Sequence, residues 1–135
     1  MPEKVLVQNE YMTLQYMADK GIIYHTIHKP VGGQPLRDVL NVGTEALGKY
    51  GVCKWLSDDR KNGPLSEEDR EWGFHNWNRR TIDMGWKYWA LVVPQEVADA
   101  GTMFPTMAAL FELGLRMMVF TTLEEAFEWL GNMPN

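Results

Sequence analysis

The chain has 135 residues, which is enough for one domain with a single hydrophobic core. Its 45% hydrophobic content excludes a disordered chain, and its net charge of −5 argues against nucleic acid or an anionic membrane as the principal partner. The only cysteine, Cys53, cannot form an intramolecular disulfide, and no apolar run is long enough for a signal peptide or a membrane span, so we expect a cytoplasmic protein.

The first part of the chain carries the pattern of a β-hairpin. Residues 11–18 and 22–28 are apolar and β-prone, and Asp19-Lys20-Gly21 between them supplies turn residues. A short strand over residues 5–8 is expected before this hairpin.

Residues 35–50 change to a helical period, with an apolar stripe at spacings of three and four. Pro35 suits the first helical position, and Gly51 suits the left-handed position just past the helix end. Gly43 lies inside the stripe, where the missing side chain would let the helix approach a sheet closely.

A short strand is predicted over residues 52–56, followed by a polar loop. Ser66 and Asp69 form a variant of the capping box and predict a helix over about residues 67–84. Residues 86–93 become continuously apolar, as in a buried central strand, and Pro94 ends this strand.

The last third repeats the alternation of helix and strand. Residues 95–100 are expected to make one helical turn, Pro105 to interrupt the chain, and a helix then to run from Met107 to a stop at Gly114. A strand follows over residues 116–121, and Thr122 with Glu125 caps a final helix that ends at Gly131.

Together these elements predict an α/β fold, in which residues 1–135 form a single domain. The order β-β-α-β-α-β-α-β-α implies a mixed, mostly parallel sheet that opens with a β-hairpin and is flanked by about four helices. Eight residues are predicted to be buried against this sheet: Leu36, Leu40, Leu47, Leu91, Val93, Val119, Phe127 and Leu130.

The order of five segments resembles the STAS domain, and more closely its SpoIIAA-like branch, which is related to CRAL-TRIO lipid-binding domains. The segments are the hairpin, WLSDDRK, SEEDREW, ALVVP and TLEEAFEWL, over roughly residues 10–131. The resemblance implies a domain that works through protein contacts or by holding a ligand, without chemistry of its own. Phospho-switched members carry an Asp-Ser pair at a helix start; neither Ser57 nor Ser66 matches it, so we do not transfer the phosphorylation switch.

Ligands of open α/β sheets gather outside the carboxyl ends of the strands. That edge should collect His28 and Lys29, then Ser57, Asp58, Asp59 and Arg60, then Pro94 and Gln95, and finally Thr121 and Thr122. The Asp pair has two interpretations: a cation site or general base, or a turn in which Asp bonds to backbone amides and Arg60 with Lys61 offsets the charge. We favour the turn, because neighbouring residues leaving a strand point in different directions.

Other candidates for chemistry are incomplete. His25 and His28 should face opposite sides of the sheet as two half-exposed strand histidines, and no third ligand completes a metal site. The Gly32-Gly33 loop lacks the P-loop lysine and the dinucleotide-binding glycine spacing. Cys53 is expected inside a strand, and no nucleophile motif is present. We therefore predict no catalytic residue, no metal and no cofactor.

Trp72 is the main candidate for an interface. At 100° per residue it falls opposite the apolar stripe of the 67–84 helix, on a polar face with His75 and Arg79. Large aromatic residues on such faces are enriched at interfaces and ligand walls; the alternative is that a loop covers Trp72.

Three functional hypotheses follow. The leading one is a non-enzymatic STAS-like domain acting in a protein complex, as a homodimer. The second is a binder of a small apolar or amphipathic ligand between sheet and helices, to which the nine methionines would adapt. The third is an enzyme using the edge from Ser57 to Arg60.

Overall fold

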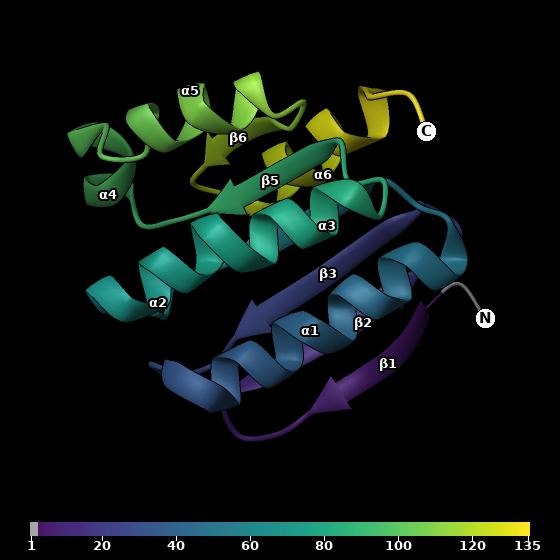
Figure 1. Ribbon diagram of the computed structural model, residues 1–135, viewed down its shortest axis with the longest axis horizontal. Coiled ribbons are helices and arrows are strands. Elements are labelled where there is room, and N and C mark those ends of the chain that lie inside the picture. The colour runs from purple at the N-terminus through teal and green to yellow at the C-terminus, as the bar shows by residue number, and fades with distance from the viewer. Residues whose placement is uncertain (1–2) are drawn as a thin grey trace.

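The computed structural model describes residues 3–135, whose strands form one mixed sheet (Figure 1). The six strands follow one another across the sheet in chain order. β1 to β3 pair antiparallel and β3 to β6 pair parallel, so β2 alone runs against the others. This confirms the mixed, mostly parallel sheet with an opening hairpin. The strands are β1 (Glu3–Gln8), β2 (Met12–Met17), β3 (Ile22–Ile27), β4 (Lys54–Asp58), β5 (Tyr88–Val92) and β6 (Arg116–Phe120).

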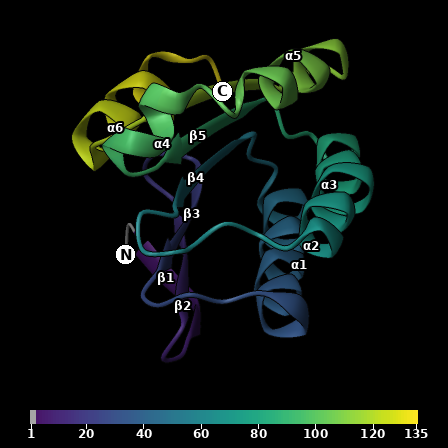
Figure 2. The same ribbon diagram turned by 90° about the vertical axis from the view of Figure 1, so that its left-hand side faces the viewer.

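Helices cover both faces of the sheet unequally (Figure 2). The α1 helix and the continuous α2–η1–α3 helix lie side by side on one face, and α6 lies on the opposite face. None of the helices in residues 3–135 is long and apolar enough to cross a membrane. The helices are α1 (Gly33–Tyr50), α2 (Glu67–Trp72), the π-helical η1 (Gly73–Asn78), α3 (Arg79–Asp83), α4 (Gln95–Ala100), α5 (Phe104–Glu112) and α6 (Leu123–Asn132).

The predicted helix ends are confirmed where the signal is local. Gly51 adopts φ 65°, and its N–H donates to the carbonyls of Leu47 and Gly48 at the end of α1. Ser66 accepts a hydrogen bond from the N–H of Asp69, and Thr122 accepts one from the N–H of Glu125. Gly51 thus satisfies carbonyls at a helix C-terminus, and Ser66 and Thr122 satisfy backbone donors that a helix N-terminus otherwise leaves free.

A cluster of tryptophans fills the space between the sheet and its two long helices. The ring of Trp77 lies 5.1 Å from that of Trp55 and 5.2 Å from that of Trp86, and Trp86 lies 4.9 Å from Trp89. A side chain at Gly43 would overlap the ring of Trp55, which confirms the close approach of α1 to the sheet. Edge-to-face and tilted aromatic contacts of this kind add to the gain from burial.

Six of the eight predicted core residues are buried: Leu36, Leu40, Leu47, Leu91, Val93 and Leu130. Val119 and Phe127 are only half-buried. Val119 belongs to β6, which is the last strand of the sheet and has no neighbour on its outer side among residues 3–135. Phe127 of α6 contacts Tyr24, with 5.3 Å between the ring centroids, at the border of the sheet area that α6 covers.

Two boundaries differ from the prediction. The strand expected over residues 52–56 is β4, Lys54–Asp58, so Ser57 and Asp58 belong to the strand and are buried. Pro105 does not interrupt the chain, because it occupies the first turn of α5, where proline has no hydrogen bond to lose.

The predicted orientation of Trp72 is wrong, although the 67–84 helix exists. Its middle turn is π-helical, so residues five apart share a face, and Trp72 therefore stands on the side of Trp77. Trp72 is half-buried against the main core, and the guanidinium of Arg37 lies 5.2 Å from its ring centroid. The chain itself thus covers much of this tryptophan.

Candidate functional site

Asp58 and Asp59 turn toward opposite faces of the sheet. Asp58 lies on the α6 face and accepts two hydrogen bonds from the guanidinium of Arg60, at 2.9 Å from Nε and 2.8 Å from Nη2, which raises the pKa of Arg60. The backbone N–H of Arg60 also donates to Asp58. Asp59 points to His25 on the other face. This arrangement supports the turn interpretation over a shared cation site.

His25 is buried and both of its ring nitrogens are occupied, which contradicts the expected half-exposed histidine. The indole N–H of Trp55 donates to Nδ1 at 3.1 Å, so Nδ1 carries no proton and Nε2–H donates to Asp59 at 2.7 Å. A general base needs a free nitrogen facing the substrate. His25 is therefore fixed as a structural link between β3 and the end of β4. His28 is exposed and bonds to Thr13.

Ser57 lies next to His25 across the sheet but is not its partner. Its hydroxyl is fully buried and accepts a hydrogen bond from the indole N–H of Trp89 at 2.9 Å. Because His25 has no nitrogen left for it, Ser57, His25 and Asp59 do not form a nucleophilic triad. Ser57 and His25 instead each accept a hydrogen bond from a buried indole N–H, and Asp59 accepts one from His25.

Asp69 joins the N-termini of two helices, a role that no sequence pattern indicates. Its carboxylate accepts the backbone N–H of Gly33 at 3.0 Å and a guanidinium N–H of Arg37 at 3.1 Å. The Gly33 bond is the largest of the effects that hold the pKa of Asp69 below its usual value, and Arg37 adds to it. Asp69 therefore ties α1 to α2 and is fully engaged within the chain.

The remaining predicted site residues do not meet the Ser57–Arg60 group. Thr121 follows β6, two strands from β4 and hence about 10 Å away. His75 and Arg79 are exposed on the α2–η1–α3 helix, where His75 pairs with Glu71 at 3.4 Å and Arg79 lies 5.8 Å from the ring centroid of Phe74. That His75 and Arg79 contribute to an interface stays a prediction.

The amino end of β4 differs from its carboxyl end, because a buried lysine lines a cavity there. Lys54 is 3% exposed and lines a cavity of about 290 Å³ between the β2–β3 turn and the end of α6. A lysine inside the apolar run VCKWL was the signal available in the sequence. Neighbouring Cys53 is buried, which raises the pKa of its thiol and disfavours a reactive thiolate.

Within residues 3–135, no group of three or more His, Cys, Asp or Glu side chains is placed to hold a metal ion. Comparison of the chain with protein-family models, with curated proteins and with solved structures finds no significant match.

Proposed function

We propose that this protein is a non-enzymatic, STAS-like interaction domain of the cytoplasm that forms a homodimer through the open edge of β6. The observation that carries the proposal is an apolar edge strand flanked by exposed aromatic residues. The opening hairpin followed by βα units in chain order supports the STAS-like part.

The outer side of β6 offers main-chain groups for pairing. The N–H of Arg116 donates to Lys87 and the carbonyl of Phe120 accepts from Val93, so alternate residues of β6 face β5. Met117 and Val119 therefore direct their N–H and C=O groups outward. A strand edge of this kind is a template for another strand.

Apolar side chains surround this edge. Phe104 and Phe111 of α5 are 66% and 56% exposed, and Met118 of β6 is 40% exposed. Arg116 curls toward α5, with its guanidinium 5.0 Å from the ring centroid of Phe111. Exposed apolar surface beside an unpaired strand is typical of an association surface.

The opposite edge of the sheet is less suited to pairing, although Val5 of β1 is 51% exposed. β1 begins with the charged pair Glu3 and Lys4, and its register shifts between Val5 and Val7. Charges and irregular pairing are devices that block edge-to-edge association. We therefore assign association to β6 and not to β1.

A two-fold axis at Met118 would pair the outward main-chain groups of β6 with those of a second copy. In an antiparallel pair centred there, Met117 lies opposite Val119 of the second copy, and the outward groups of both residues exchange hydrogen bonds. Met118 then meets its own copy, which covers its exposed side chain.

Sedimentation equilibrium of Met118→Lys tests this proposal, with Met84→Lys as the matched control. Met84 is similarly exposed, at 47%, but lies at the end of α3. We expect a wild-type dimer, a dissociation constant at least about tenfold higher for Met118→Lys because two charges meet at the axis, and no change for Met84→Lys. A monomeric wild type, or a Met118→Lys dimer as tight as the wild type, would contradict the proposal.

The two other hypotheses receive less support. A lipid-like ligand between sheet and helices needs space that Trp55, Trp77, Trp86 and Trp89 occupy. An enzyme at the Ser57–Arg60 edge needs groups that are free to meet a substrate, whereas Ser57, Asp58 and Asp59 each bond within the chain.

A further inference from the structure

Lys54 is a buried lysine without a partner among residues 3–135. Among residues 3–135 it makes no hydrogen bond and no ion pair, although it is only 3% exposed. Two side-chain nitrogens in this part of the chain are fully enclosed without a partner, Arg37 Nε and Asn78 Nδ2. Lys54 Nζ is not one of them, and Lys54 lines the cavity.

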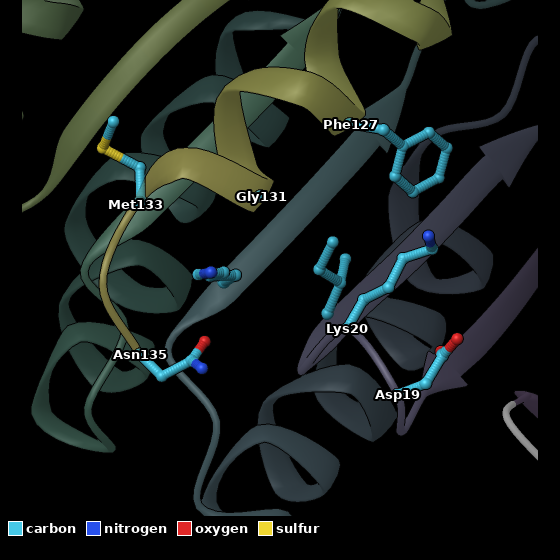
Figure 3. Close-up of a pocket in the computed structure, with 8 residues that line it drawn as sticks. Asp19, Lys20, Phe127, Gly131, Met133 and Asn135 are labelled. Carbon is cyan, nitrogen blue, oxygen red and sulfur yellow. The ribbon is translucent and has the colours of Figure 1, made fainter.

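The cavity is bounded by three separate segments (Figure 3). Phe127 and Lys20 lie on one side, and Met133 and Asn135 on the other. Its volume of about 290 Å³ exceeds by several-fold the roughly 30 Å³ of one water molecule. A second cavity of about 200 Å³ shares Asp19, Lys20 and Asn135 with it.

The charged groups around the cavity neutralise the positive charge of Lys54 only in part. The C-terminal turn of α6, with Gly131, brings the negative end of a helix dipole near it. Asp19 lines the cavity but is not within ion-pair distance of Lys54. Lys20 adds a second positive charge, with its Nζ 5.9 Å from the ring centroid of Phe127. A buried ammonium is costly unless it is paired, so a bound anion would lower the free energy of this region.

We propose that this cavity binds a small organic monocarboxylate, with Lys54 as its buried cationic anchor and Lys20 at its mouth. The carboxylate would accept hydrogen bonds from Lys54 Nζ, which has three donors and no partner in the described part of the chain. Ile22, Phe127 and Met133 offer apolar contacts to the body of the ligand.

A monocarboxylate suits the site better than phosphate for two reasons. Asp19 in the lining repels a dianion, and phosphate has no apolar part to contact Phe127. The two anions share the chemistry that Lys54 recognises, so the experiment includes both. The site does not depend on the proposed dimer, because it lies at the β2–β3 turn and the end of α6, away from the open edge of β6.

Calorimetric titration with benzoate and with inorganic phosphate, in a buffer free of other small anions, tests the proposal. Benzoate should bind wild type, and Lys54→Met should bind it at least about tenfold more weakly because the ion pair is lost. Lys20→Met should weaken binding less. The control Lys61→Met removes the same charge at the opposite end of β4 and should leave the affinity unchanged.

Three results would overturn the proposal: no binding of benzoate to wild type, equal binding to Lys54→Met, or tighter binding of phosphate than of benzoate. If Lys54→Met does not fold, amide chemical shifts of wild type during the benzoate titration decide the question. Shifts confined to Lys20, Lys54 and Gly131 support the site, whereas shifts elsewhere contradict it.

Discussion

The two ends of β4 treat their charged residues in opposite ways. At the carboxyl end, Asp58 pairs with Arg60 and Asp59 with His25. At the amino end, Lys54 is buried beside a cavity without a partner in residues 3–135. A dense group of polar residues therefore need not be a functional site. The carboxyl end is saturated by internal contacts, whereas the charge without a partner lies at the amino end.

Among the internally bonded carboxylates, the largest effect is expected for Asp69→Ala, at the junction of α1 and α2. The change removes the cap on Gly33 and leaves Arg37 without its buried partner, so we expect a loss of about 2–3 kcal/mol in the free energy of unfolding. Urea denaturation measures this loss. Glu68→Ala is the control, because Glu68 also approaches Arg37, at 3.5 Å, but is highly exposed and should contribute little.

The contribution of Asp69 should also depend on pH. Its pKa is lowered in the folded protein, so its stabilisation is complete above the unfolded pKa of about 3.9 and is lost as the pH falls through the folded pKa. The stability gap between wild type and Asp69→Asn should therefore narrow below about pH 4. A gap that stays constant down to acid unfolding would show that the carboxylate charge contributes nothing.

A smaller loss is expected for Asp59→Ala, which leaves the Nε2–H of buried His25 without its acceptor. We expect about 1–2 kcal/mol by urea denaturation, since the partly exposed position lets water replace some of the bond. Asp38→Ala is a control at an exposed carboxylate of α1 that bonds to Gln34. Equal stability of Asp59→Ala and wild type would show that the His25–Asp59 hydrogen bond does not stabilise the fold.

The double change Asp58→Asn with Asp59→Asn tests the cation-site interpretation directly. We expect a modest loss of stability and no difference between the two proteins in their response to Ca²⁺ or Mg²⁺ in thermal unfolding. Stabilisation of wild type by either ion that disappears in the double variant would establish the metal site that the side-chain directions argue against.

The sequence predicted what local chemistry determines. Gly51, Ser66 and Thr122 mark helix ends through backbone groups within a few residues, and the hairpin and apolar runs follow from periodicity. Contacts between distant segments were not predictable in this way. His25 and Asp59 are 34 residues apart, and Asp69 reaches back 36 residues to Gly33.

Trp72 shows a second limit of sequence patterns. A fixed 100° per residue presumes an α-helix throughout, and the π-helical turn over Gly73–Asn78 changes which residues share a face. Lys54 shows a third limit. A single charged residue in an apolar run is also compatible with an exposed position at a sheet edge, so the sequence does not predict its burial. Only the placement of α6 over β4 reveals that this lysine is enclosed.

The contrast between the two ends of β4 is tested most directly by comparing Lys54→Met with Asp58→Asn in urea denaturation. Each variant removes one charge from a buried end of the same strand while keeping a similar side-chain volume. We predict that Asp58→Asn lowers the free energy of unfolding by about 1 kcal/mol, and that Lys54→Met leaves it unchanged or raises it by about 1 kcal/mol in anion-free buffer. A loss for Lys54→Met as large as that for Asp58→Asn would show that Lys54 already has its partner within the chain, and would contradict the account.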